Sequence, residues 1–261
     1  MKRILIIALL GLTVLACSKE AEQLPQVIAH RGYWDTEGSA QNSIASVTKA
    51  GEIGAYGSEF DVNLTADGEL VVNHDYTFHG ITIYEADYAA IKDSTLANGE
   101  VIPTLDKYIE AFLPFPEMKL VFELKSEGDS LYEAVSIPKC IETVKKYGVE
   151  DRTIFIAFSL SACKEIARLM PDNMVQYLTG DIAPAELFEM GIKGIDYHYS
   201  VFDEHPEWVA EAHGLGMVCN AWTVNKEEDI RRMLDLGVDQ ITTNAPELAQ
   251  AIIAERAAAK K

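Results

Sequence analysis

Positively charged side chains are scarce in this sequence. The 261 residues contain 22 lysine and arginine side chains against 41 aspartate and glutamate, which gives a formal net charge of −19. Binding of nucleic acid depends on lysine and arginine that neutralise phosphates, and no run of basic residues is present beyond the first positions. Nucleic acid is therefore excluded as an expected partner. A substrate that carries phosphate would need positive charge supplied locally by its site.

Cysteine is also rare, with four in the chain. Three of them, Cys140, Cys163 and Cys219, are scattered through apolar segments and lack the spacing of a disulfide framework or a metal site. We expect them to be buried thiols without chemistry. No segment of the sequence points to a protein partner.

The apolar run at the start of the chain is too short to span a membrane comfortably as a permanent helix. Lys2 and Arg3 precede this run, which covers 4–16, and Cys17 follows it directly. Residues 14–17 resemble a bacterial lipobox, in which the cysteine after the cleavage site is lipidated. We therefore expect a signal peptide over 1–16, a lipidated tether over 17–26, and membrane attachment in the bacterial cell envelope, periplasmic or at the outer membrane. An ordinary secretory signal with an incidental Cys17 is the alternative.

No low-complexity linker divides the remaining chain, so we expect a single domain over 27–261. Strand-like and helix-like segments alternate through it, which is typical of a parallel sheet with crossover helices. The expected strands cover 27–29, 57–63, 120–124, 153–158, 175–178, 194–197, 217–221 and 240–242. Helices are expected over 43–53, 104–112, 131–147, 161–170, 185–190, 207–215, 226–236 and 246–256, with Ser161 and Asn225 as N-caps.

Eight pairs of strand and helix predict a TIM (β/α)8 barrel. An open doubly wound sheet has the same local rhythm and remains an alternative, although no glycine-rich dinucleotide fingerprint follows the first strand. An extra short strand is expected over 69–73, and a small insertion over about 76–103 follows the second barrel strand. Because long excursions on barrels usually carry function, we expect this insertion at the functional rim.

Acidic side chains gather where the expected strands end. Glu59 and Asp61 share one face of the second strand, with Phe60 opposite, and Glu123 lies near the end of the third strand. Carboxylates about 4 Å apart repel by about 4 kcal/mol per pair at an effective dielectric near 20. A pocket lined by three of them therefore calls for a cation, and oxygen ligands favour Mg²⁺ or Ca²⁺ over zinc. A solvated strand face is the alternative for the first two residues alone.

Two histidines and two cations flank these carboxylates in the sequence. His30 ends the first strand and His74 ends the extension of the second, and imidazole titrates near neutrality, so both are candidates for proton transfer. Arg31 and Lys125 are suited to holding phosphoryl oxygens, whereas surface salt bridges are the alternative. The overall acidity of the chain favours the functional interpretation of these two cations.

Several short motifs occur in order between Val27 and about Glu247: His30-Arg31-Gly32, Gln41-Asn42-Ser43, Glu59-Phe60-Asp61-Val62, Asp67-Gly68, Val71-Val72-Asn73-His74-Asp75, Phe122-Glu123-Leu124-Lys125 and Trp222-Thr223-Val224. Each is weak alone, but the ordered set resembles the glycerophosphodiester phosphodiesterase family. The resemblance implies a TIM barrel with a small insertion after the second strand. It also implies one divalent cation (Mg²⁺ or Ca²⁺) and a set of site residues: metal ligands Glu59, Asp61 and Glu123, an acid and base pair His30 and His74, phosphate contacts Arg31 and Lys125, and Trp222 beside the glycerol end of the substrate. The implied reaction is hydrolysis of a glycerophosphodiester to glycerol 3-phosphate and an alcohol, through a cyclic phosphate that water opens.

Two positions depart from the pattern of that family. Gln41 stands where the family commonly has glutamate, and Asn244 stands where it commonly has aspartate, so each departure replaces a carboxylate by an amide. Because the other site residues are retained, we expect an active enzyme. Two alternatives stay open: a phosphodiesterase acting on lysophospholipid, sphingolipid or inositol phosphodiesters, and a non-catalytic binding lipoprotein on the same scaffold.

Overall fold

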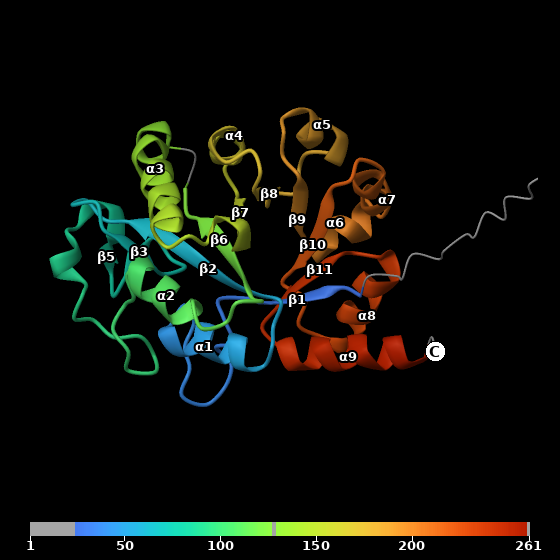
Figure 1. Cartoon of the computed structure of the whole chain (residues 1–261), viewed down its shortest axis with the longest axis horizontal. Helices are drawn as coiled ribbons and strands as arrows, with labels where there is room; N and C mark the ends of the chain where they lie inside the picture. The colour runs from blue at the N-terminus through green and yellow to red at the C-terminus, as the bar shows by residue number, and fades with distance from the viewer. Residues whose placement is uncertain (1–23, 127–128, 260–261) are drawn as a thin grey trace, which may run out of the picture.

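Eight parallel strands form a closed barrel in the computed structural model of the protein, which describes residues 24–126 and 129–259 (Figure 1). The strands are β1 (Gln26–Ala29), β2 (Gly57–Leu64), β6 (Lys119–Leu124), β7 (Thr153–Ala157), β8 (Met174–Tyr177), β9 (Gly194–His198), β10 (Val218–Trp222) and β11 (Gln240–Thr243). The barrel closes because β1 pairs in parallel with both β11 and β2. The TIM barrel is therefore confirmed, and the open doubly wound sheet is wrong.

Helices cover the outside of the barrel (Figure 1). They are α1 (Ile44–Glu52), α2 (Leu105–Phe112), α3 (Ser130–Lys146), α4 (Leu160–Leu169), α5 (Pro184–Glu189), α6 (Tyr199–Glu204), α7 (Glu207–Gly214), α8 (Glu227–Leu236) and α9 (Pro246–Ala259). The side chain of Gln250 in α9 donates a hydrogen bond to the carbonyl of Ile53, so the last helix lies beside the first. The sequence did not predict α6, because its six residues follow β9 directly and no glycine or proline separates the two elements.

Alternation along the strands separates the apolar core from the polar interior of the barrel. On β2, Phe60 and Val62 pack outward in the main core under the helices, while Glu59 and Asp61 face inward. The rings of Phe60 and Phe122 meet edge to face, with centroids 5.0 Å apart. Full burial of such a ring contributes roughly 1.5–3 kcal/mol, so the outward face fixes which side chains point into the barrel.

The segment after β2 forms a small unit of its own. Strand β3 (Leu70–Val72) pairs antiparallel with β2, and β4 (Thr77–Phe78) forms a hairpin with β5 (Ile81–Thr82). The 3₁₀ turns η1 (Ile83–Glu85) and η2 (Tyr88–Ala90) follow, and η3 (Glu150–Arg152) precedes β7. A separate cluster of buried side chains holds this unit together: Val71, Phe78, Ile83, Ile91 and Ile102. The small insertion after the second barrel strand is thereby confirmed.

Both predicted N-caps are wrong. The cap of α4 is Ser159, whose hydroxyl accepts from the backbone N–H of Ala162, while the Ser161 hydroxyl donates to Glu133. Lys226 occupies the cap position of α8 without a capping side chain, and Asn225 instead accepts from the backbone N–H of Asn244. Ser161 is the second residue of α4 and so lies past the cap position, whereas the side-chain oxygen of Asn225 is engaged by a tertiary partner.

The predicted signal peptide over 1–16, the lipidation site Cys17 and most of the tether over 17–26 lie outside the described residues. Within the described ranges, no helix is both long and apolar enough to cross a membrane.

Candidate active site

Three buried carboxylates meet at the carboxyl ends of two neighbouring strands. Glu59 and Asp61 project from β2 and Glu123 from β6, and the parallel register places Asp61 directly beside Glu123. One oxygen from each side chain lies within 4.8 Å of the others. The structure thus brings together the three residues that the sequence predicted as metal ligands.

These carboxylates cannot all carry full negative charge in isolation. Burial, and then the charges of Asp61 and Glu123, raise the pKa of Glu59 well above its ordinary value. Burial, and then Asp61, raise the pKa of Glu123 to about 7. Burial also works to raise the pKa of Asp61, but the charge of Lys125 and other neighbours leave it below the ordinary value. Added positive charge among the three would relieve this repulsion.

The donor set fits a hard divalent cation. Its ligand atoms are all carboxylate oxygens, which Mg²⁺ and Ca²⁺ prefer. Glu59 Oε1 is buried and has no hydrogen-bond partner among the described residues. A buried anionic oxygen without a partner is costly, and a cation between the carboxylates would satisfy it.

Two cationic side chains reach the same cluster. Lys125 Nζ lies 2.7 Å from Glu123 Oε1 and 3.3 Å from Asp61 Oδ1, and these charges hold the pKa of Lys125 above its ordinary value although burial alone would lower it. Arg31 Nε lies 3.9 Å from Asp61 Oδ2, and its Nη1 donates to Gln41 Oε1 at 2.6 Å. Arg31 and Lys125, the predicted phosphate contacts, therefore lie beside the carboxylates. The side-chain amide of Gln41 orients Arg31 by accepting its hydrogen bond.

The loop after β1 is held in an unusual backbone conformation. Arg31 and Asn42 both have positive φ angles, of 55° and 59°, which residues other than glycine seldom adopt. The backbone N–H of Arg31 donates to Glu59 Oε2 at 2.6 Å, and the side chain of Asn42 donates to Asp61 Oδ2 at 2.8 Å. Both strained residues thus orient carboxylates of the cluster.

The sequence pattern predicted no role for Asn42. The available signal was weak: an asparagine tolerates the left-handed region, and Asn42 directly precedes Ser43, the N-cap of α1. Nothing in the local pattern says that its amide reaches a carboxylate 19 positions away.

His30 is fixed in one tautomer by Asn244. The indole N–H of Trp34 donates to Asn244 Oδ1 at 3.0 Å, which identifies that atom as an acceptor, and His30 Nδ1 lies 2.7 Å from the same oxygen. His30 therefore carries its proton on Nδ1, and Nε2, 3.9 Å from Glu59 Oε2, has a free lone pair. Burial, and then the charge of Arg31, lower the pKa of His30 to about 4.

His74 has a charged partner instead. Its Nδ1 lies 2.7 Å from Asp75 Oδ1, so this nitrogen carries a proton and Nε2 is the reactive atom. Burial lowers the pKa of His74, while the charge of Asp61 opposes that shift. The two histidines thus face one site with different partners, an amide for His30 and a carboxylate for His74.

A groove of about 1030 Å³ opens beside this cluster. Arg31, Asn42 and His74 line it from the barrel, and Phe78 and Leu96 line it from the insertion. The insertion therefore lies at the functional rim, as its position in the sequence predicts.

Trp222 ends β10 at the same rim. Its ring packs edge to face against Phe158 and His198, and its Nε1 donates to the carbonyl of Asp196. The structure does not place Trp222 in the hydrogen-bonded cluster, so its predicted contact with glycerol stays a prediction.

Comparison with known proteins agrees with this geometry. Residues 30–248 match the model of the glycerophosphoryl diester phosphodiesterase family. The chain is 33% identical to a glycerophosphodiester phosphodiesterase of Caldanaerobacter subterraneus over 85% of this chain and 94% of that protein. A glycerophosphodiester phosphodiesterase structure from Parabacteroides distasonis is 47% identical, with a TM-score of 0.89 over 91% of this chain and 100% of that one.

Another similar structure contains a bound product. An Oleispira antarctica phosphodiesterase in complex with sn-glycerol 3-phosphate is 29% identical, with a TM-score of 0.76 over 88% of this chain and 97% of that one. Taken with the barrel, its insertion and the clustered carboxylates, these matches place the chain in the glycerophosphoryl diester phosphodiesterase family.

Proposed function

We propose that this enzyme hydrolyses glycerophosphodiesters to glycerol 3-phosphate and an alcohol, using one divalent cation bound by Glu59, Asp61 and Glu123. The observation that carries the proposal is the meeting of these carboxylates with two cations and two histidines at one end of the barrel. The related Oleispira phosphodiesterase, with glycerol 3-phosphate as its product, supports the same product here.

Positive charge around the phosphate is the first requirement of this reaction. A bound Mg²⁺ or Ca²⁺ would act as a Lewis acid on a phosphoryl oxygen. Lys125 and Arg31 supply fixed cations at the edge of the carboxylate cluster, and each is already oriented by a hydrogen bond, to Glu123 and to Gln41. Such preorganised charge stabilises negative charge that develops on phosphorus without rearrangement.

The two histidines divide the proton transfers. His30 acts as the base in the first step, because its Nε2 lone pair is free and because burial and the charge of Arg31 keep its pKa low, although the hydrogen bond to Asn244 opposes that shift. His74 acts as the acid, because the carboxylate of Asp75 stabilises its protonated form. The nucleophile is the neighbouring hydroxyl of glycerol, and water then opens the cyclic phosphate with the two roles exchanged.

A substrate panel tests this function. We expect release of glycerol 3-phosphate from glycerophosphocholine, measured by a coupled glycerol 3-phosphate dehydrogenase assay. Lysophosphatidylcholine and inositol phosphodiesters are run beside it, since preference for either would move the substrate class to a lipid or to an inositol ester. Failure to cleave any of these diesters in the presence of Mg²⁺ or Ca²⁺ would contradict the proposed function.

Attachment to a membrane is a separate proposal, supported by the sequence pattern around Cys17. Lipid chains on this residue would place the enzyme in the cell envelope near its source of glycerophosphodiesters. Fractionation of cells that express the wild type or Cys17→Ser tests it. The wild type should sediment with membranes and the variant should be released, whereas equal distribution of both would contradict lipidation.

A further inference from the structure

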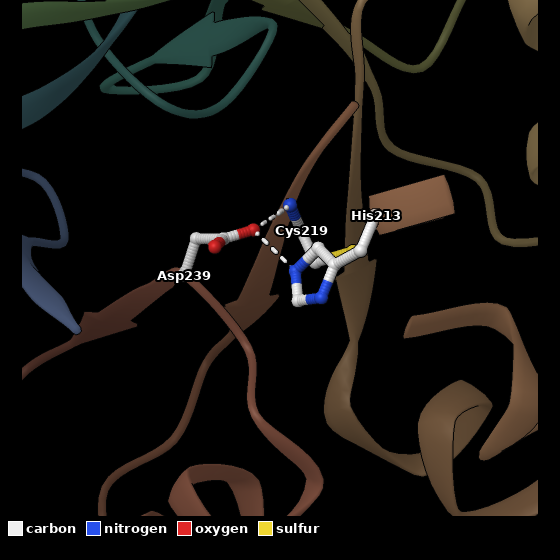
Figure 2. A group of neighbouring side chains, drawn as sticks. All are labelled: His213, Cys219 and Asp239. Carbon is white, nitrogen blue, oxygen red and sulfur yellow. Dashed lines mark hydrogen bonds and ion pairs between the residues drawn. The ribbon is translucent and has the colours of Figure 1, made fainter. Parts of the chain in front are cut away.

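A second group of metal-binding side chain types lies at the opposite end of the barrel from the carboxylate cluster. His213 belongs to the last turn of α7, Cys219 is the second residue of β10, and Asp239 directly precedes β11. One nitrogen, sulfur or oxygen atom from each lies within 4.8 Å of the others. Figure 2 shows the carboxylate of Asp239 directed at the ring of His213 and at the backbone nitrogen of Cys219.

The carboxylate is already oriented by its hydrogen bonds. Asp239 Oδ2 lies 3.0 Å from His213 Nε2 and accepts from the backbone N–H of Cys219 at 2.8 Å. A backbone donor that fixes the direction of a carboxylate is a usual support for a metal ligand. The proton shared between His213 and Asp239 occupies the place that an ion would take between the same two atoms.

The sulfur of Cys219 is less engaged than that of another buried cysteine. Its Sγ lies 4.0 Å from the carbonyl of Val209, whereas Cys163 Sγ lies 3.5 Å and 3.7 Å from the carbonyls of Ala157 and Gln176. The hydrogen bond between His213 and Asp239 does not require a sulfur atom beside it. The position of Cys219 therefore adds a soft ligand that this hydrogen bond leaves unused.

The group is open to solvent on one side. The side chains of His213 and Asp239 are 41% and 40% exposed, while Cys219 is buried. Asp239 and Val218 also line a hollow of about 590 Å³ at this end of the barrel. An ion can therefore approach from water and still find one ligand in the protein interior.

We infer that His213, Cys219 and Asp239 form a second metal site, for a borderline-soft divalent ion of the zinc class. Nitrogen, sulfur and oxygen ligands together suit Zn²⁺, unlike the all-oxygen carboxylate cluster. On binding, the Cys219 thiol releases its proton to solvent, and the proton between His213 Nε2 and Asp239 is lost to solvent while His213 Nδ1 carries the ring's one proton. The thiolate and the Asp239 carboxylate then balance the two charges of the ion, and the bound His213 is neutral. The exposed side leaves a coordination position for water.

Local spacing could not have revealed this site. His213 and Cys219 lie six positions apart, and Asp239 lies twenty positions further on, so no zinc-binding motif appears in the sequence. The barrel brings them together because β10 and β11 are neighbours and α7 packs on β10.

Cobalt titration of the full chain tests the inference, because a cysteine thiolate bound to Co²⁺ gives a charge-transfer absorption that carboxylate ligands cannot give. Chelator-treated protein is titrated with Co²⁺ and then with Zn²⁺. We expect the band to saturate near one equivalent in the wild type and to disappear as Zn²⁺ replaces Co²⁺. His213→Gln, which keeps the thiol, should weaken binding of Co²⁺ by at least about tenfold.

Control variants identify the thiolate. Cys17→Ser, Cys163→Ser and Glu123→Gln should keep the band, and Cys219→Ser should lose it, with circular dichroism confirming that each variant is folded. The inference is overturned if the wild type shows no thiolate band or if the band persists in Cys219→Ser. Neither result bears on the carboxylate cluster, so the proposed phosphodiesterase function stands or falls separately.

Discussion

Asn244 and Gln41 give His30 and Arg31 neutral partners at the edge of the carboxylate cluster. Each amide keeps the geometry of a hydrogen bond, at 2.7 Å to His30 Nδ1 and 2.6 Å from Arg31 Nη1, without adding charge. A carboxylate in either position would add negative charge beside a cluster in which the pKa values of Glu59 and Glu123 are already raised. The consequence is sharpest for His30, whose protonation state depends directly on this partner.

Replacing Asn244 by aspartate should change the pH dependence of the reaction. His30 works as a base only when unprotonated, and its pKa of about 4 keeps it so at all but acidic pH. A carboxylate at position 244 stabilises the charged imidazole and raises the pKa of His30, so the acidic limb of the kcat/KM profile should move up by about 1 to 3 pH units. The profile is measured with glycerophosphocholine from pH 4 to 9. An unmoved acidic limb would argue against His30 as the base.

Separate replacement of the two histidines should distinguish base from acid. We expect His30→Ala and His74→Ala each to lower kcat/KM for glycerophosphocholine by about 10² to 10⁴. A 4-nitrophenyl diester of glycerol phosphate has a leaving group that needs no proton. His74→Ala should therefore recover most of its activity on that substrate, whereas His30→Ala should not. Recovery in His30→Ala alone would reverse the two roles.

At the scale of elements, the turn between β1 and α1 positions much of the site. Gly32 has a φ angle of +73°, and its backbone N–H donates to the carbonyl of Glu59 at 3.0 Å, which ties the turn to β2. A Cβ atom here would collide with the side chain of Ser46 in α1. Two separate constraints therefore act on this glycine, one from the backbone angle and one from packing.

Alanine substitution at two glycines separates these constraints. Gly38 has nearly the same φ angle, +74°, but open space where a Cβ would lie. Gly38→Ala should cost about 1–2 kcal/mol of the free energy of unfolding from the backbone angle alone. Gly32→Ala should cost about 1–3 kcal/mol more from overpacking, and should lower activity in the folded protein. Urea denaturation measures both, and equal losses would show that Ser46 moves aside without cost.

Most barrel elements could be predicted from the sequence, because buried strands and amphipathic helices carry their own pattern. The predicted strand over 57–63 and the observed β2 (Gly57–Leu64) differ by one residue, and the side-chain alternation that aims Glu59 and Asp61 inward follows from that strand alone. Helix α6 was missed because it follows β9 without a glycine or proline between them, and the cap Ser159 was missed because the nearby Ser161 offered the same chemistry.

Contacts between residues far apart in the sequence could not be predicted from local patterns. The bond between His30 and Asn244 joins residues 214 positions apart, and only closure of the barrel through β1 and β11 brings them together. The side chain of Asn42 donates to the Asp61 carboxylate because the loop after β1 adopts a backbone conformation with positive φ, which no local pattern predicts.

At the scale of the whole molecule, net charge opposes the binding of an anion. The chain carries a formal charge of −19, so its surface repels a negatively charged diester before Arg31 and Lys125 can act on it. This repulsion reaches about 30 Å at 0.01 M salt but only about 10 Å at 0.1 M.

Salt should therefore affect two substrates differently. Raising the ionic strength from 0.01 M to 0.1 M should increase kcat/KM for glycerophosphoglycerol, which has a net negative charge, and leave glycerophosphocholine, which is neutral overall, nearly unchanged. Initial rates at low substrate concentration measure both values. A decrease for glycerophosphoglycerol would mean that the local cations, rather than the acidic surface, dominate the approach.

The most direct test of the account is recovery of activity by a divalent cation. Protein treated with a chelator and freed of it should release no glycerol 3-phosphate from glycerophosphocholine, and added Mg²⁺ or Ca²⁺ should restore release in the wild type. Glu123→Gln, which removes one of the three clustered carboxylates, should need a higher concentration of the ion for half of its maximal rate. A rate that is undiminished in the chelator would contradict the central claim that these carboxylates act by holding a cation.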